Sequence, residues 1–212
     1  MTWPLTKRWL RNWGARKDEL GRRWPGDELV AANLEPHTRA VEIHAPAENV
    51  WPWIVQFGFG KAGFYSYELL ERLVGIPVTN IETIEASMQS LAVGDEVLLH
   101  PKAPGIPVAM VEPGRHICFG QLEPQTANPK EDMKQSWSFY VTPEKRDTCR
   151  LVLRACYQEI RKRPLRERAG FALLQPIDFV MEQRMLRTLK RLAEDTYARH
   201  EAALLPQERD LV

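Results

Sequence analysis

The spacing of hydrophobic residues changes along the chain, and each change predicts a new element. Residues 37–45 alternate around Val41 and Ile43, which predicts a half-buried β-strand. Apolar residues then recur at helical spacing from Pro46 onward, and Pro52 should kink or divide this short helix. Those apolar residues are Val50, Trp53, Ile54 and Phe57.

A glycine-rich segment separates this helix from a second one. Gly58, Gly60 and Gly63 break the chain, and Ser66 is a natural N-terminal cap for a helix that follows it. Gly75, with a proline two residues later, should end that helix. The pattern therefore predicts two short helices inserted after one strand.

From Gly94 the hydrophobic period becomes two, which predicts a series of strands. The predicted strands are 95–100, 106–112, 115–122, 133–142 and 148–160. The turns between several of them are short and rich in proline and glycine, so neighbouring strands should be antiparallel. The alternation directs two sets of residues inward: Trp137, Phe139 and Val141 on one strand, and Leu151, Leu153, Ala155 and Tyr157 on the next.

The last predicted element is a long amphipathic helix from about Pro176 to His200. Its apolar side carries Leu174, Ile177, Met181, Met185, Thr188, Leu189 and Leu192. A meander with one apolar face must bury it, and this helix is the only apolar element long enough to cover it. We therefore predict an α+β fold in which a curved antiparallel sheet wraps around the C-terminal helix. The two short helices would close one end of the space between them.

Three stretches resemble a known superfamily. Residues 50–75 (VWPWIVQFGFGKAGFYSYELLERLVG), 93–97 (VGDEV) and 176–190 (PIDFVMEQRMLRTLK) are similar to the helix-grip proteins. This group includes the START domains, the birch-pollen-allergen fold and the polyketide cyclase/dehydrase group (SRPBCC). WGA at 13–15 and PGDELV at 25–30 resemble an uncharacterised bacterial branch. The resemblance covers about Trp13 to Ala193 and implies an internal cavity for an apolar or amphipathic molecule. It does not imply a particular reaction.

A cavity of this kind is lined mainly by apolar and aromatic side chains, with a few polar groups that orient the ligand. The candidates in this chain come from the first helix, the glycine-rich lid, the strands and the last helix. They are Trp53, Phe57, Phe64, Tyr65, Tyr67, Trp137, Phe139, Met181 and Met185. The competing interpretation is that these side chains pack in an ordinary core, and for any single methionine it is the more common case.

Asp178 and Tyr65 are the candidates for acid or base chemistry. Asp178 falls within the apolar stripe of the last helix, where an ionised carboxylate is costly unless it is paired. It could be a pocket acid with a raised pKa. If Pro176 begins the helix, Asp178 instead lies in the first turn and satisfies free backbone N–H groups, and the residue pattern favours this interpretation. A raised pKa would favour the pocket acid, and a lowered one the cap.

Composition divides the chain into three parts. The whole has 212 residues and a net charge of +1, but residues 1–25 carry seven Lys and Arg against two acids, and 161–168 carry five against one. We expect a basic, Trp-rich extension over 1–36, a ligand-binding domain over 37–200 and a tail over 201–212. The tryptophans of the extension could lie on an anionic membrane or against the protein's own core, and intramolecular packing is the more common use of such a stripe.

Other classes of function are not favoured. The five histidines show no ligand spacing for a metal, and neither a nucleotide-binding loop nor a nucleophile elbow occurs, so we expect no metal and no cofactor. The near-neutral charge and apolar body argue against nucleic-acid binding. No signal peptide or membrane span is expected, which predicts a cytoplasmic protein. The leading hypothesis is a carrier or sensor of a hydrophobic or amphipathic molecule. The alternatives are a cyclase/dehydrase-type enzyme and a membrane-peripheral module for lipid exchange.

Overall fold

The computed structural model describes residues 8–29, 36–73, 75–120, 135–157 and 165–209, with the backbone alone at 135, 157, 165–175 and 205–209. Six antiparallel strands form one sheet in the order β1-β6-β5-β4-β3-β2. Their bounds are β1 His37–Ile43, β2 Glu96–Val97, β3 Ile106–Glu112, β4 His116–Gly120, β5 Gln135–Lys145 and β6 Thr148–Tyr157. The sheet order joins the first strand to the last, and β1 also contacts the C-terminal helix.

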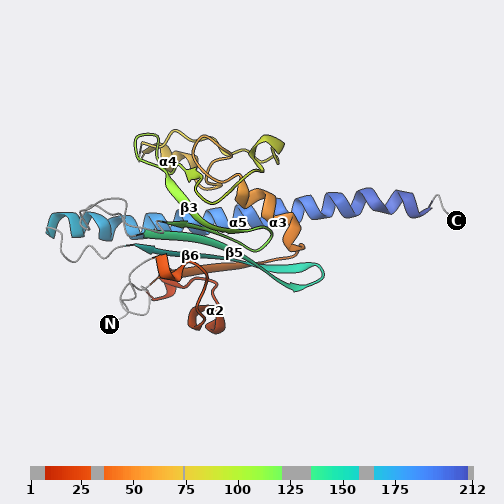
Figure 1. Ribbon diagram of the computed structural model, residues 1–212, viewed down its shortest axis with the longest axis horizontal. Helices are drawn as coiled ribbons and strands as arrows, with labels where there is room; N and C mark the ends of the chain where they lie inside the picture. Colours follow the sequence, from red (N-terminus) through yellow and green to blue (C-terminus); the bar gives the residue numbers. More distant parts are fainter. Residues whose placement is uncertain (1–7, 30–35, 74, 121–134, 158–164, 210–212) are drawn as a thin grey trace.

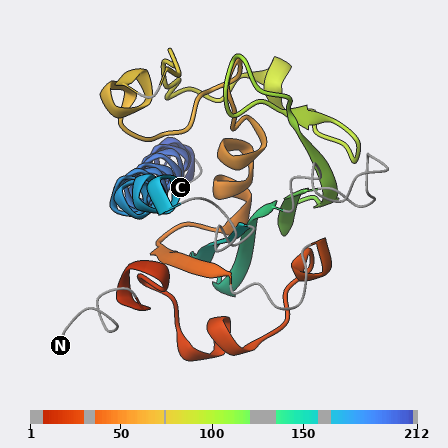
Figure 2. The same cartoon turned by 90° about the vertical axis from the view of Figure 1, so that its left-hand side faces the viewer.

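The helices lie in three places around this sheet (Figures 1 and 2). The long helix α5 (Leu165–Arg209) runs along the sheet and projects beyond it at its C-terminal end (Figure 1). The short helix α3 (Ala47–Val55) packs on α5 and β5. The lid segment, residues 56–90, lies above them and contains α4 (Glu68–Leu73) and η2 (Ala86–Met88). Helices α2 (Lys17–Gly21) and η1 (Asp27–Leu29) lie on the opposite side of the sheet.

The face of the sheet toward α5 holds the main core. Phe139 and Val141 of β5 and Leu151 and Leu153 of β6 are buried there with residues of α3 and α5, and Trp137 packs against them. The inward direction predicted for these five residues is confirmed. Ala155 is buried as well, whereas the side chain of Tyr157 lies outside the described residues.

The opposite face of the sheet is covered by residues 8–29, which we call the N-terminal layer (Figure 2). Trp24 is 3 % exposed and packs against Tyr140, with the ring centroids 4.4 Å apart and the ring planes tilted by 43°, in a second core that also includes Ala40 and Val152. The prediction that residues 37–45 form a half-buried strand is therefore wrong for β1, because Thr38 and Ala40 on its outer side are buried too. The N-terminal layer supplies the cover that the alternation pattern alone does not reveal.

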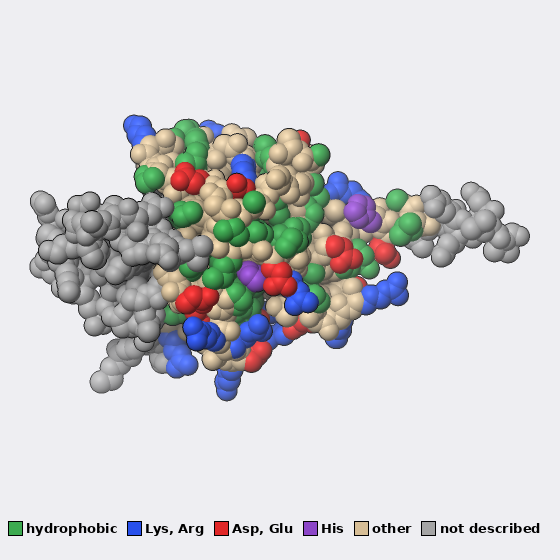
Figure 3. All heavy atoms as spheres, viewed as in Figure 1, with side chains coloured by type: hydrophobic (Ala, Val, Ile, Leu, Met, Phe, Trp, Pro, Cys, Tyr) green, Lys and Arg blue, Asp and Glu red, His purple; other side chains and the backbone are tan. Residues whose placement is uncertain are grey.

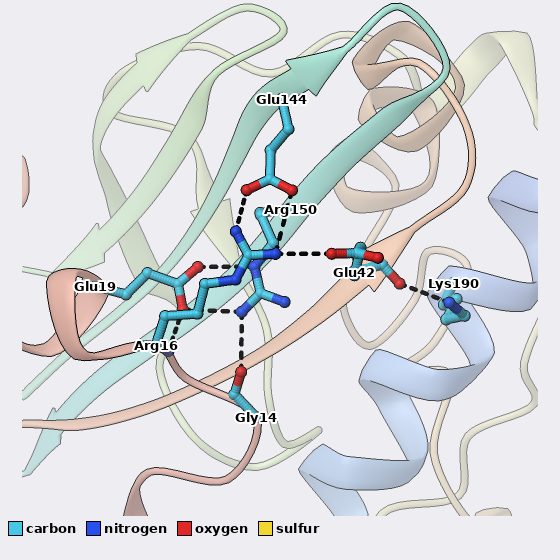
Figure 4. A network of polar contacts seen from close by, with 7 residues as sticks. All are labelled: Gly14, Arg16, Glu19, Glu42, Glu144, Arg150 and Lys190. Carbon is cyan, nitrogen blue, oxygen red and sulfur yellow. Dashed lines mark hydrogen bonds and ion pairs between the residues drawn. The ribbon is translucent and has the colours of Figure 1, made fainter.

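Charged side chains join the N-terminal layer to the sheet (Figure 4). Arg150 of β6 donates from Nε and Nη2 to the two carboxylate oxygens of Glu19, each at 2.8 Å, and from Nη2 to the carbonyl of Gly14 at 2.9 Å. Arg16 reaches Glu42 and Glu144 at the more exposed side of the same network. On the face drawn in Figure 3, Lys and Arg side chains gather along the lower side, where this layer lies.

Gly14 allows the N-terminal layer to approach β1 closely. The backbone N–H of Ala40 donates to the carbonyl of Trp13 at 3.0 Å. Gly14 has a φ of +72°, and a Cβ atom there would lie 2.0 Å from the carbonyl oxygen of Ala40. The left-handed backbone and the absent side chain are thus both needed at this position.

Three predicted boundaries are wrong. The strand expected over 95–100 is only two residues long, Glu96–Val97, because only these residues pair with β3. Strand β5 continues to Lys145, past the predicted end at Thr142, because its pairing with β6 persists to a tight turn at residues 146–147. Helix α5 begins at Leu165 rather than at Pro176. Pro176 is therefore an interior residue of the helix and not its first one.

Candidate functional site

Most of the predicted cavity-lining residues fill the core between the sheet and α5. Trp53, Phe57, Phe64, Tyr65, Phe139 and Met185 are each 6 % exposed or less. Phe57 lies at the centre, with its ring centroid 5.3 Å from that of Phe64, 5.0 Å from that of Trp137 and 5.4 Å from that of Phe139. The rings therefore pack against one another, as the core-packing interpretation predicts.

Two of the predicted residues remain partly exposed. Trp137 of β5 and Met181 of α5 are half-buried, and the neighbouring helix residues Ile177 and Val180 are 37 % and 40 % exposed. The indole Nε1 of Trp137 is itself buried, and no acceptor for it is found among the described residues. A buried N–H without an acceptor costs about 1–3 kcal/mol. Trp137 therefore packs against the core with part of its surface accessible, and it carries one unsatisfied donor.

Tyr65 is held by hydrogen bonds within the protein. Its hydroxyl donates to the carbonyl of Trp53 at 3.0 Å and accepts from the amide of Gln56 at 2.9 Å, and burial raises the pKa of the phenol. Its backbone has a φ of +56°, and the side-chain oxygen of Asn80 accepts hydrogen bonds from the N–H groups of Phe64 and Tyr65. These contacts give Tyr65 a structural role in the lid. Its role as an acid or base stays a prediction.

Tyr67 is 44 % exposed and lies on a hollow of about 300 Å³ between the lid segment and α5. The wall of this hollow is mostly polar. It comprises Tyr65, Ser66, Tyr67, Glu68, Asn80, Glu82, Arg184 and Thr188. Of the predicted site residues only Tyr65 and Tyr67 reach it. Its polar character was not foreseen from the sequence, because the residues come from three separate segments.

Asp178 belongs to a cluster of charged side chains between β1 and α5. Its carboxylate accepts a hydrogen bond from Arg39 at 3.2 Å, and Arg39 also donates to Glu182. His37 lies 3.0 Å from Glu182. Because α5 begins at Leu165, the interpretation of Asp178 as a residue in the first turn of the helix is wrong. The sequence pattern did not point to His37, Arg39 and Glu182 as members of a cluster. The one signal was that these polar residues fall on the inward side of a predicted strand and of a predicted helix.

The two carboxylates of this cluster titrate in opposite directions. Burial, together with the charge of Glu182, raises the pKa of Asp178 to about 6. Burial alone would raise the pKa of Glu182 as well, but His37 and Arg39 hold it below its ordinary value. Candidate ligand atoms of His37, Asp178 and Glu182 lie within 4.8 Å of one another, a spacing that a metal ion could use. The guanidinium of Arg39 already bonds both carboxylates, so a protein cation takes the place of an ion here.

Replacing Asp178 by Asn should change how stability depends on pH. Between about pH 4 and pH 6 the folded protein keeps a proton that the unfolded chain has released, so the contribution of Asp178 falls as pH rises through this window. The side chain is 40 % exposed, and after allowance for solvent screening we expect about 1 kcal/mol. The free energy of unfolding should be measured with urea at both ends of the window. Relative to the wild type, Asp178→Asn should become more stable by this amount as the pH rises toward 7. A parallel pH dependence in the two proteins would contradict the raised pKa.

The tryptophans of the N-terminal layer contact the protein's own body. The ring centroid of Trp9 lies 5.4 Å from that of Phe179, and that of Trp13 lies 6.4 Å from it. Arg39 donates from Nε to the carbonyl of Leu10 and so links this layer to the charged cluster. Trp9 still exposes 55 % of its surface, and contact of residues 1–25 with a membrane stays a prediction. None of the described helices combines the length and apolar character needed to cross a membrane.

Comparison with known proteins finds similarity only to solved structures of low sequence identity and low TM-score. No family model matches the chain, and no curated protein matches it. Among solved structures, a protein from Nitrosomonas europaea is 16 % identical with a TM-score of 0.42, covering 80 % of this chain and 99 % of its own. A polyketide cyclase-like protein from Corynebacterium glutamicum is 13 % identical with a TM-score of 0.36, covering 81 % and 97 %. A major latex protein family member from Arabidopsis thaliana is 15 % identical with a TM-score of 0.30, covering 76 % and 97 %.

The order of elements is what identifies the fold. One strand, two short helices, an antiparallel meander and a long C-terminal helix follow one another along the chain, and the last strand pairs with the first. This is the arrangement that the sequence resemblance implies. The chain has the helix-grip fold.

Proposed function

We propose that the protein binds a small hydrophobic or amphipathic molecule at the Trp137 end of the core, as a carrier or sensor. The observation that carries the proposal is the indole N–H of Trp137, which is buried among aromatic rings and lacks an acceptor among the described residues. A ligand oxygen placed there would satisfy it. The half-buried Met181 offers a flexible apolar contact on the facing helix.

Ile177, one helical turn before Met181 on α5, is 37 % exposed and could add an apolar contact on that helix. The filled core around Phe57 limits the ligand to this end, since the rings farther along the sheet already contact one another. A ligand with an apolar body and one oxygen acceptor fits this combination.

The proposal predicts that Trp137→Phe weakens the binding of neutral probes that carry one oxygen. The substitution keeps an aromatic ring and removes the N–H, so we expect about five- to tenfold weaker binding. Calorimetric titration with 1-naphthol, 1-decanol and 2-nonanone measures the affinity. The indole N–H signal of Trp137 in a nitrogen-15 correlation spectrum should also shift when a probe binds.

Trp9→Phe is the matched control, because Trp9 is exposed on the N-terminal layer. It should bind the probes with wild-type affinity. The proposal fails if none of the three probes binds saturably, or if Trp137→Phe binds as tightly as the wild type.

A further inference from the structure

The hollow between the lid segment and α5 has an unusual balance of charges. Its two carboxylates each have an arginine partner: Glu68 accepts from Arg72 at 3.4 Å, and Glu82 accepts from Arg191 at 2.6 Å. Glu68 also accepts from the backbone N–H of Asn80 at 2.8 Å. The acidic groups of this wall are therefore already satisfied.

Arg184 is the cation in the wall of this hollow that lacks such a partner. No carboxylate among the described residues pairs with it, and its guanidinium instead lies over the ring of Tyr67, with 5.4 Å from the guanidinium carbon to the ring centroid. Stacking on an aromatic face holds the guanidinium in place. Its N–H groups point outward in the guanidinium plane and stay free to donate hydrogen bonds. Such a group is suited to receive an anion that the protein itself does not provide.

Thr188 adds a second unsatisfied group one helical turn from Arg184. Thr188 is 5 % exposed, and its hydroxyl has no hydrogen-bond partner among the described residues. Residues four apart on a helix are neighbours, with Cβ atoms about 6 Å apart. A rotation about the Cα–Cβ bond of Thr188 would turn the hydroxyl toward a group held by Arg184. One oxyanion with two oxygens can then accept from both side chains.

We propose that this hollow binds a small molecule bearing a carboxylate, held by Arg184 and Thr188 and flanked by the ring of Tyr67. A monoanion matches the single unpaired cation, whereas a phosphate dianion would meet the carboxylates of Glu68 and Glu82 on the same wall. The volume of about 300 Å³ is at the small end of ligand pockets, which favours a compact ligand. The site is separate from the one proposed at Trp137 and does not depend on it.

Calorimetric titration of the full chain with sodium benzoate tests the proposal. We expect a dissociation constant on the order of 1 mM or tighter, and no binding of the uncharged analogue benzamide. Arg184→Gln should weaken benzoate binding at least about tenfold, because it removes a charge-assisted hydrogen bond. Thr188→Val should weaken it about fivefold. The melting temperature of Thr188→Val should stay unchanged or rise, since the lost hydroxyl had no partner.

Arg199→Gln serves as the control, because Arg199 is an exposed arginine on the same helix outside the hollow. It should bind benzoate as the wild type does, which excludes a general effect of net charge. The proposal is overturned if benzoate does not bind saturably, if benzamide binds equally well, or if inorganic phosphate binds more tightly than benzoate. Wild-type affinity in Arg184→Gln would overturn it as well.

Discussion

Glu19→Gln should lower the free energy of unfolding by about 3–5 kcal/mol, the usual cost of leaving one member of a buried ion pair without its partner. The Glu19 and Arg150 side chains are 6 % and 7 % exposed, and two hydrogen bonds of 2.8 Å join them. In the variant the guanidinium keeps the carbonyl of Gly14 but loses the charge that balances it. Urea unfolding at neutral pH measures the change.

Two further variants show whether the effect comes from the unpaired charge. Asp18→Asn changes an exposed acid on the same short helix and should cost less than about 1 kcal/mol. Replacing both Glu19 and Arg150 by Met removes the pair together, and this double variant should recover most of the loss. If the free energy of unfolding of Glu19→Gln lies within about 0.5 kcal/mol of the wild-type value, the buried Glu19–Arg150 pair contributes little to stability.

Glu182→Gln is the second substitution with a large expected effect, about 3 kcal/mol or more. Glu182 is 3 % exposed and faces both His37 and Arg39. Asp178 is the other carboxylate in contact with Arg39, and it is too exposed and too readily protonated to replace Glu182 fully. The substitution therefore leaves positive charge buried between β1 and α5.

The pH dependence of unfolding identifies the origin of this loss. Because the pKa of Glu182 is lowered in the folded protein, its contribution is present above its ordinary pKa and is lost as pH falls through the folded value. The difference between wild type and Glu182→Gln should thus be largest near neutral pH and shrink in acid. Glu201→Gln, an exposed acid farther along α5, should leave the unfolding free energy within about 0.5 kcal/mol at every pH. A difference that stays constant into acid would point to lost packing instead.

The inner face of the sheet could be predicted because it follows a simple period. Phe139, Val141, Leu151 and Leu153 alternate with outward residues, and a period of two fixes which side of a strand is buried. The cover on the outer face could not be predicted in this way. The N-terminal layer binds through a few particular groups, such as Trp24, and through the absence of a side chain at Gly14. Contacts of that kind leave no periodic signal.

The sequence predicted the residue types of the candidate site better than it predicted how those residues are arranged. The aromatic residues around Phe57 were expected to line a cavity, but their mutual packing depends on ring geometry that spacing does not encode. Pro176 was expected to begin the last helix, since proline is favoured at a first helical position. The helix instead starts eleven residues earlier, and Asp178 consequently pairs with Arg39 rather than with free backbone groups.

The N-terminal layer also sets an order of events during synthesis of the chain. Glu19 pairs with Arg150, 131 residues later, and Asp27 pairs with Arg154, 127 residues later. The N-terminal layer can contact β1 early, but it cannot complete these pairs until the hairpin of β5 and β6 has left the ribosome. Until then Trp24 lacks the Tyr140 ring against which it packs in the finished protein. Such distant contacts slow folding and prolong the exposure of apolar surface.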